Sequence, residues 1–449
     1  MRDQLTNEIK NGWINAVTSG IDNTGNTDAT LKIIEIINNA DPGSVIYFPK
    51  GIYLVSGNIS ISKPLTILGD SYYHPANSHF PMYDQTIFKV ADYCENITIF
   101  TKSGQYNRIA IKNITMYSTS FVFNYTNYIP VSGSYGGQFS YTINKNNVNA
   151  IDIHNDSWGS LIENVFINGF SGVGIDGPCD STYNNIYVSH SGTGMIIETD
   201  STATNIRVQF CKNGAYIKNS CNVTNIRVEE IANVGITFNS YYTSVSNMTV
   251  DMCDYNGIVT EQLLYSTIQG TVMRCGLNYY NNNVANLPDI DKSKAAKIRN
   301  TGISYLNRFI LNAKKSDGYR DNDLSLWQTY LFAFEADFQQ TSIDFPHNIP
   351  YSYSSNTPNG LFNNLFGSLI YISSTTSPYV EIEFNTNQYR YVIKGKNIMQ
   401  MGNLAIGQIG FIVPIYIGQM LLDISTTPNK LYVATSISLS GWMQINTSV

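Results

Sequence analysis

The sequence predicts an all-β protein, a right-handed single-stranded parallel β-helix with an N-terminal capping helix and a C-terminal β-sandwich-like domain. Three observations predict this fold class. The 449-residue chain exceeds the size of one ordinary hydrophobic core. It holds 32 tyrosines and 20 phenylalanines, which suit pleated sheets. A motif of asparagine, an apolar residue, any residue and usually valine recurs at near-constant spacing.

The first 44 residues are predicted to form an N-terminal attachment segment followed by the capping helix. Asp28 is placed to cap a helix whose apolar positions run from Leu31 to Ile37, and Asp41-Pro42-Gly43 is expected to end it. Short strands are predicted next, at residues 45–48 and 52–55, split by Pro49-Lys50-Gly51.

The recurring motif is the main signal for a solenoid. Its copies begin at nearly regular intervals, at Asn164, Asn185, Asn205, Asn225 and Asn247. A glycine and a second short apolar run follow each copy, so each repeat is predicted to be one coil that buries its apolar face by stacking on its neighbours. The asparagines are predicted to stack as a hydrogen-bonded ladder. Leucine-rich and hexapeptide solenoids are disfavoured, because leucine is scarce in the repeats and the period is not six.

Weaker copies of the motif extend the predicted β-helix over residues 45–280. A stretch at 118–147, rich in Tyr, Ser, Gly and Asn, interrupts the coils and is predicted to be a lateral loop. Residues 281–323 are predicted to be a connector, and the apolar runs of residues 324–449 predict a C-terminal β domain.

Charge and composition restrict the partners. The chain carries 27 Lys and Arg against 33 Asp and Glu, a net charge of −6 that argues against nucleic-acid binding and against docking on an anionic membrane. No run of eighteen apolar residues and no apolar leader is found, so neither a membrane span nor a signal peptide is predicted. The six cysteines lack metal-site spacing and are expected to be reduced core thiols, with no bound metal.

Two stretches resemble known families. The order GNTDAT, helix, PGSVIYFPKGIYLVSGNISI resembles the entry motif of the pectate-lyase-like right-handed β-helix superfamily. The ending from Gly418 through Asn429 to Trp442 resembles that of many bacteriophage tail proteins. Together they make the chain look like a bacteriophage tailspike or a tail or collar appendage that binds a receptor. This resemblance implies a homotrimer located in the virion.

Strand alternation predicts where chemistry can sit. Because every second residue of a strand faces outward, Tyr187, Arg207 and Arg227 are expected to form one exposed column. At the next outward position, the same face is expected to carry Gln209, Glu229 and Asp251. These residues predict a groove in which Tyr187, Arg207, Arg227 and Gln209 bind substrate.

The groove has a catalytic interpretation. Two close carboxylates, Glu229 and Asp251, shift one another's pKa as acid/base cleavage of a glycosidic bond requires, and His190 at a strand end is a candidate proton shuttle. The competing interpretation is a surface ladder of arginines and acids that only neutralise one another.

Further polar groups are expected on other faces. A second column, Glu198, Lys218, Asn239 and Glu261, is either a second wall or a solvated surface. Asp152, His154 and Glu163 form a weaker cluster next to the lateral loop. The catalytic sets of polygalacturonases and of calcium-dependent pectate lyases have no counterpart, so no cofactor is predicted, and calcium is left open without a motif.

The favoured function is that of a phage virion appendage, made in the host cytoplasm, that binds host cell-surface polysaccharide or a teichoic-acid-like polymer during adsorption. Its further partners would be other tail or collar proteins, with no nucleic acid and no membrane. Turnover by a glycoside hydrolase, lyase or phosphodiesterase activity is left open. The alternatives are a free polysaccharide hydrolase or lyase of the same fold, and a non-catalytic structural adhesin.

Overall fold

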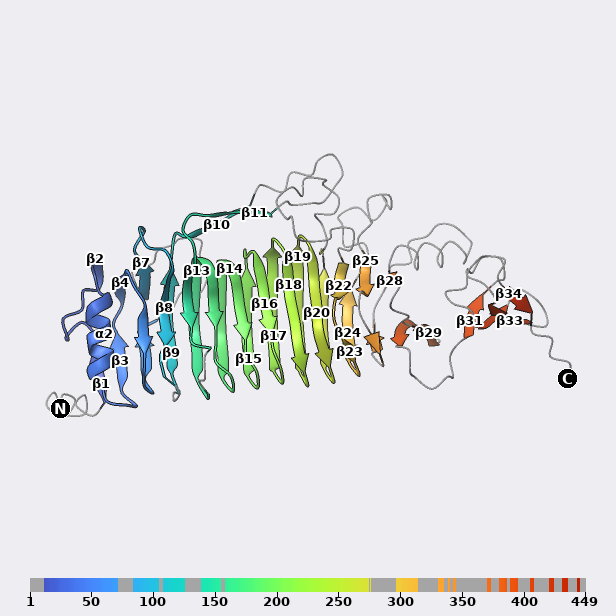
Figure 1. The fold of residues 1–449 in the computed structure, drawn as a ribbon, viewed down its shortest axis with the longest axis horizontal. Coiled ribbons are helices and arrows are strands. Elements are labelled where there is room, and N and C mark those ends of the chain that lie inside the picture. The colour runs from blue at the N-terminus through green and yellow to red at the C-terminus, as the bar shows by residue number, and fades with distance from the viewer. Residues whose placement is uncertain are drawn as a thin grey trace.

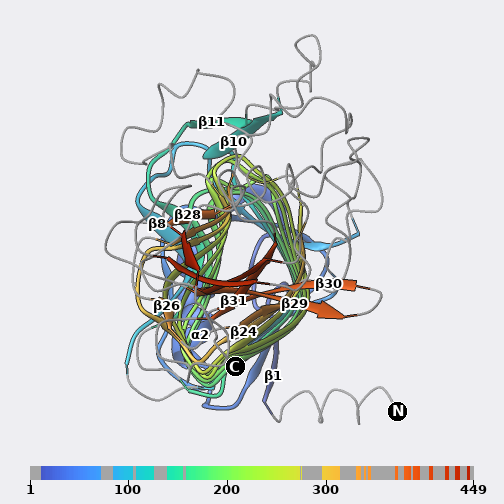
Figure 2. The ribbon, with the colours of Figure 1, turned by 90° about the vertical axis from the view of Figure 1, so that its right-hand side faces the viewer.

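A computed structural model describes residues 12–71, 84–104, 108–125, 139–154, 158–273, 275 and 296–313, together with short strands between residues 330 and 444. Most of the described strands form a stack of β coils that runs along the long axis (Figure 1). Viewed along the stack, the strands of successive coils lie over one another and enclose a common interior (Figure 2). No helix in the described ranges is both long and apolar enough to span a membrane.

The strands follow the predicted order of short β segments. Those from the N-terminus to the last predicted coil are β1 (Trp13–Asn15), β2 (Thr24–Asp28), β3 (Val45–Phe48), β4 (Gly51–Val55), β5 (Ile59–Ile61), β6 (Thr66–Gly69), β7 (Thr86–Val90), β8 (Ile97–Lys102), β9 (Ala110–Tyr117), β10 (Phe121–Tyr125), β11 (Phe139–Ile143), β12 (Val148–Asp152), β13 (Leu161–Asp176), β14 (Thr182–Ile197), β15 (Thr202–Gln209), β16 (Asn213–Ile217), β17 (Asn222–Ile231), β18 (Val234–Tyr241), β19 (Ser244–Cys253), β20 (Asn256–Leu264) and β21 (Thr267–Met273).

The capping helix α2 (Thr30–Asn39) covers the N-terminal end of the stack (Figure 1). It buries Ile33, Ile36 and Ile37 against the first coils. Asp28 lies one residue before the helix cap, and its Oδ1 accepts a hydrogen bond of 2.9 Å from the backbone N–H of Thr30. The predicted capping role of Asp28 is therefore carried out from just outside the helix.

The coils pair in parallel, as the repeats predict. One ladder joins β14, β15, β17, β19 and β21, and a second joins β14, β16, β18 and β20. Within each motif the two apolar residues are buried: Ile206 and Val208 are 2% and 0% exposed. The predicted parallel β-helix is thus confirmed for this part of the chain, and alternate side chains of each strand fill one continuous core.

The repeated asparagines form the predicted ladder. Side-chain amides donate from Asn185 to Asn164 at 2.7 Å, from Asn225 to Asn205 at 2.6 Å and from Asn247 to Asn225 at 3.1 Å. Each of these asparagines has a positive φ of between 52° and 58°, the left-handed region that asparagine tolerates better than most residues. Asparagine therefore suits these positions for two reasons. It tolerates the left-handed backbone of the bend, and its side-chain amide forms hydrogen bonds along the ladder.

The recurring glycine lies where there is no room for a side chain. A Cβ atom on Gly194 would overlap a side-chain carbon of Val208 and would lie 2.8 Å from the carbonyl oxygen of Gly214. Glycine is required here because the coil interior leaves no room for a side chain. All six cysteines are unpaired, five of them buried, as expected of core thiols.

The lateral loop predicted at 118–147 contains an antiparallel hairpin, β10 with β11. The hairpin lies along one corner of the stack (Figures 1 and 2). The part of the loop from residue 126 to 138 lies outside the described residues.

Parallel pairing continues beyond residue 280. The strands concerned are β22 (Ala296–Asn300), β23 (Ser304–Tyr305), β24 (Arg308–Ala313), β25 (Tyr330–Phe334), β26 (Phe338–Gln339), β27 (Ser342–Asp344) and β28 (Ile370–Ile372). They pair in parallel with β20, β21 or one another. The region expected to be a connector thus contributes coil strands.

Shorter sheets follow in the C-terminal region. An antiparallel pair consists of β29 (Tyr379–Asn385) and β30 (Gln388–Lys394), and a four-stranded sheet of β31 (Leu404–Gly407), β32 (Met420–Asp423), β33 (Lys430–Ala434) and β34 (Trp442–Gln444). The residues between them, and residues 1–11, lie outside the described part. The sandwich-like domain and the domain boundaries stay predictions.

Candidate functional site

The residues of the predicted groove lie on neighbouring coils in register. Tyr187 is paired with Arg207, and Arg207 with Arg227. On the next outward position, Gln209 is paired with Glu229 and Glu229 with Asp251. The predicted neighbours are therefore correct, because the coil length and the strand period are both regular here.

These side chains bind one another. Arg227 donates to Oε1 of Glu229 at 2.5 Å, and a guanidinium nitrogen of Arg207 lies 3.4 Å from Oε2 of Glu229. The Arg207 guanidinium also stacks 5.1 Å from the ring centre of Tyr187. The Tyr187 hydroxyl donates to Gln209 at 2.8 Å. Two guanidinium groups thus share one carboxylate beside an aromatic ring.

Burial distinguishes the acids from the arginines. Glu229 and Asp251 are 7% and 4% exposed, whereas the side chains of Arg207 and Arg227 are 39% and 57% exposed. Glu229 therefore lies beneath the two arginines, and Asp251 is buried beside it. The groove presents cationic and aromatic groups to solvent more than carboxylates, an arrangement better suited to binding than to direct attack by an acid.

A third acid, Glu230, was missed in the sequence. Burial raises its pKa, the nearby charges of Glu229 and Asp251 raise it further, and a hydrogen bond from Gln209 opposes them. Glu230 has a φ of +55°, so its side chain leaves the strand at the corner of the coil. Strand alternation assumes an extended backbone at every residue, so it gives no signal at Glu230, where a positive φ interrupts β17.

His190 lies at an equivalent corner, with a φ of +53°. Its ring lies 5.0 Å from that of Phe210 and 6.4 Å from that of Phe123, and its Nδ1 is 2.7 Å from the Ser189 hydroxyl. Burial lowers the pKa of His190 to about 4. A proton shuttle works best with a pKa near the working pH, so this environment favours a packing role for His190.

The hairpin covers this corner. Phe121 and Phe123 of β10 and Phe139 of β11 pack with Ala232 and Met252, and Phe210 contributes a partly buried ring. The Phe139 backbone N–H donates to Asp254 at 2.8 Å, which fixes β11 to the coil that contains β19 and β20. The β10–β11 hairpin is therefore anchored on the stack.

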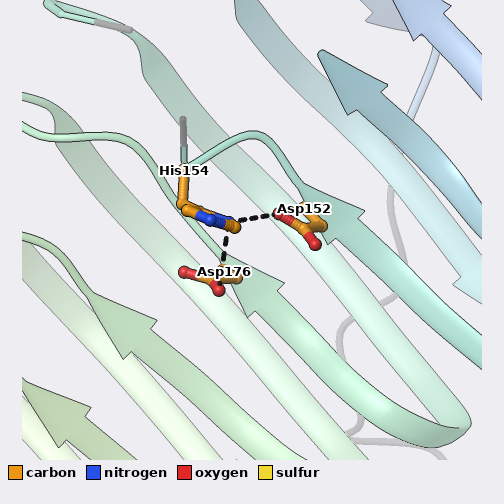
Figure 3. A group of neighbouring side chains, drawn as sticks. All are labelled: Asp152, His154 and Asp176. Carbon is orange, nitrogen blue, oxygen red and sulfur yellow. Dashed lines mark hydrogen bonds and ion pairs between the residues drawn. The ribbon is translucent and has the colours of Figure 1, made fainter. Parts of the chain in front are cut away.

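A second polar site lies on another flank (Figure 3). Asp152 ends β12, Asp176 ends β13, and the two are register partners on adjacent coils. Nδ1 of His154 is 2.5 Å from Oδ1 of Asp152 and 3.3 Å from Oδ2 of Asp176. Burial raises the pKa of Asp176 to about 6. Sequence reasoning found Asp152 and His154 but not Asp176, because the step from Asp152 to Asp176 is longer than any step between the strong copies of the repeat.

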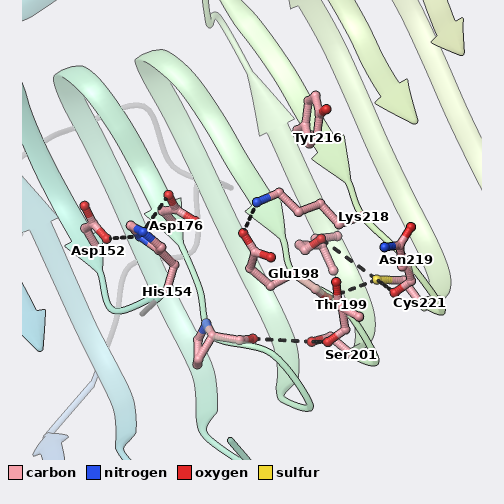
Figure 4. A network of polar contacts seen from close by, with 12 residues as sticks. Asp152, His154, Asp176, Glu198, Thr199, Ser201, Tyr216, Lys218, Asn219 and Cys221 are labelled. Carbon is pink, nitrogen blue, oxygen red and sulfur yellow. Dashed lines mark hydrogen bonds and ion pairs between the residues drawn. The ribbon is translucent and has the colours of Figure 1, made fainter. Parts of the chain in front are cut away.

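The same flank continues over the next coils (Figure 4). Lys218 donates to Glu198, which is 7% exposed, and Tyr216 donates to Glu261 at 2.6 Å. The predicted second column is thus a set of bonded groups. Glu163, expected beside Asp152 and His154, pairs instead with Lys112 at 3.0 Å.

The fold is that of a pectate lyase-like β-helix. The family model for rhamnogalacturonase A/epimerase, pectate lyase-like proteins matches residues 13–216, a span that contains the capping helix and the coils as far as β16. The match agrees with the resemblance of the N-terminal entry motif. No curated protein matches the sequence.

The matches among solved structures are distant. The A-module of the mannuronan C-5 epimerase AlgE4 from Azotobacter vinelandii is 13% identical, covers 67% of this chain and 94% of its own, and gives a TM-score of 0.38. The Dettilon tailspike protein is 11% identical over 88% of this chain and 82% of its own, with a TM-score of 0.45. ORF18 of Geobacillus virus E2 is 12% identical over 99% and 88%, with a TM-score of 0.36.

Proposed function

We propose that this protein is an appendage of a phage virion that binds a host cell-surface polysaccharide or teichoic-acid-like polymer along its β-helix flank during adsorption. The observation that carries the proposal is the in-register row of Tyr187, Arg207 and Arg227. Equivalent groups repeat along the axis at the spacing of adjacent strands, about 4.8 Å. A row of this kind suits a linear polymer.

The exposed arginines favour an anionic polymer. Arg207 and Arg227 share Glu229, yet large fractions of their side chains stay exposed, so guanidinium N–H groups remain for a ligand. Guanidinium groups bind phosphate and carboxylate in a bidentate manner, and an aromatic ring such as Tyr187 offers an apolar face to a sugar. Teichoic-acid-like polymers and acidic polysaccharides contain anionic groups that guanidinium can bind and carbon-rich faces that can pack on an aromatic ring.

The virion location and a homotrimeric state are supported by the resemblance of the C-terminal ending to phage tail proteins. Mass spectrometry of purified virions and light scattering of the purified protein test these two points. A protein found only free in the culture medium would favour the alternative of a separate hydrolase or lyase.

Binding is tested with cell-wall polymers from candidate hosts. The variant Arg207→Gln/Arg227→Gln/Glu229→Gln removes the charges of the two arginines together with that of the carboxylate they share. We expect it to lose at least ten-fold in polymer affinity, measured by cosedimentation. The control Lys32→Ala/Lys50→Ala removes two exposed positive charges near the N-terminal end of the stack and is expected to bind like the parent. Equal polymer affinity of the parent, the groove variant and the control would show that the groove is not the polymer-binding site.

Turnover is read in the same incubations from reducing ends, released phosphate and unsaturated-uronate absorbance. The variant Glu229→Gln/Asp251→Asn tests whether the buried acids take part. Loss of turnover with retained binding would make the protein a depolymerase and identify the reaction class. If the parent protein binds the polymer without turnover, the protein is a non-catalytic adhesin.

A further inference from the structure

The cluster of Asp152, His154 and Asp176 has the composition of a metal site (Figure 3). Its three donor atoms all lie within 4.8 Å of one another. They come from two adjacent coils, and parallel pairing of Asp152 with Asp176 fixes their approach. The same imidazole nitrogen, Nδ1, faces both carboxylates, so the two oxygens and the nitrogen form one group of neighbouring donors.

The cluster has spare coordinating capacity. Oδ1 of Asp176 is a buried atom without a hydrogen-bond partner, although a carboxylate in such a position normally finds one. Lys218, on the same flank, does not donate a hydrogen bond to this oxygen, because it is bonded to Glu198 (Figure 4). Two carboxylates therefore face a single imidazole, and one of their oxygens is left unsatisfied.

The donor set points to a particular class of ion. Calcium and magnesium prefer oxygen ligands alone, whereas an imidazole nitrogen with carboxylates suits zinc or manganese. Tetrahedral zinc with bonds of about 2.0–2.1 Å holds its ligands about 3.3 Å apart. The distance from His154 to Asp176 is 3.3 Å, and that from His154 to Asp152 is 2.5 Å. The distance from His154 to Asp152 must lengthen when an ion binds, and the exposed fractions of the two side chains, 36% and 35%, leave solvent-filled space for this change.

We propose that Asp152, His154 and Asp176 form a binding site for a zinc or manganese ion. Three protein ligands leave a coordination position open, as in metal sites that bind a further ligand. Asp152 and His154 are the more exposed members, with side-chain exposures of 35% and 36% against 16% for Asp176. The open position would therefore lie toward solvent. The site is on a different column from the arginine groove, and the proposal does not rest on polymer binding.

The test uses the full-length protein after chelator treatment and dialysis. Titration calorimetry with Zn²⁺, Mn²⁺ and Ca²⁺ is expected to give one ion per chain, with zinc or manganese at least ten-fold tighter than calcium. Co²⁺ is added as a spectroscopic probe, because its visible absorption reports nitrogen and oxygen ligation. Asp176→Asn and His154→Asn are each expected to weaken binding at least ten-fold. Asp180→Asn, which changes an exposed carboxylate on the following turn, is the matched control.

Far-UV circular dichroism and thermal unfolding of the metal-free variants establish that they fold. Should one variant fail to fold, the other still decides the matter. The proposal is overturned if the parent protein binds none of the ions, if it prefers calcium, or if a folded variant binds as tightly as the parent.

Discussion

At the scale of single residues, the corners of the coils decide what surrounds each side chain. His190, Phe210, Glu230 and Met252 all have positive φ values and follow one another from coil to coil at nearly equal intervals. Non-glycine residues seldom adopt this conformation. Here the hairpin packs over part of the corner, and the ring of His190 lies between those of Phe123 and Phe210, whereas Glu230 accepts a hydrogen bond from Gln209.

His190 makes stability depend on pH. Burial lowers its pKa to about 4, against 6.5 in an unfolded chain. Above pH 6.5 the ring is neutral in both states, so its contribution to stability is fully present. Below pH 6.5 the unfolded chain takes up a proton that the folded protein does not, and this contribution is lost as the pH falls toward 4. The loss is about 3 kcal/mol in the free energy of unfolding, as an order of magnitude.

The variant His190→Asn removes this titration while tolerating the left-handed backbone. Thermal unfolding of both proteins between pH 7 and pH 4 measures the effect. We expect the midpoint of the parent protein to fall more steeply with acidification than that of the variant. Parallel curves would show that His190 is not desolvated as the structure places it.

At the scale of elements, the β10–β11 hairpin is held on the coils largely by its side chains. Its aromatic residues are spaced for a strand, yet they pack on residues that are distant in the sequence. Phe123 contacts the rings of His190 and Phe210, and Lys212 lies 5.6 Å from the ring of Tyr141. The opposite face of β10 carries Val122, which is 40% exposed.

Phe123→Ala is expected to release the hairpin. Truncating a buried phenylalanine costs about 3–5 kcal/mol, which exceeds what a two-stranded hairpin can provide by itself. Hydrogen exchange of the amides in β10 and β11 should accelerate at least ten-fold, while amides of β15 and β17 keep their protection. Val122→Ala is the control and should leave exchange unchanged. Uniform acceleration across the coils would contradict a local role for the hairpin.

At the scale of the whole molecule, the Asn ladder is a column that links coils. Asn225 is its most informative member, because it donates to Asn205 and accepts from Asn247. Asn225→Ala removes both hydrogen bonds and places a Cβ-bearing residue without a polar side chain in the left-handed region. The expected loss is about 1–3 kcal/mol in the free energy of unfolding.

Chemical denaturation measures this loss. Asn222→Ala, at the exposed start of the same strand, is the control and should lie within about 0.5 kcal/mol of the parent. Equal stability of the two variants would mean that the ladder is not a source of cohesion between coils.

The sequence predicts the molecule best where its repeats are regular. The coils from β13 to β21 and the pairing of Glu229 with Asp251 follow from a strand period of two and a nearly constant repeat length. Beyond residue 280 the period is hidden, because the chain between the register partners Thr267 and Arg308 is about twice as long as one repeat. The sequence did not predict Asp176 because the step from Asp152 is longer than the regular repeat. It did not predict Glu230 because that residue lies at a corner of the coil. Burial of the acids, and the docking of the hairpin, depend on contacts that no local pattern encodes.

The ladder has one more consequence, for the lifetime of the protein. An asparagine side chain deamidates when the following backbone nitrogen attacks its carbonyl carbon, and a bulky following residue hinders that attack. In this ladder the next residue is valine, isoleucine or methionine: Asn164-Val165, Asn185-Ile186, Asn205-Ile206, Asn225-Ile226 and Asn247-Met248. The apolar residue that fills the core thus also protects the adjacent amide from chemical ageing. A single conversion to aspartate would place a negative charge in a column of amides, so slow deamidation preserves the stack for as long as the protein persists.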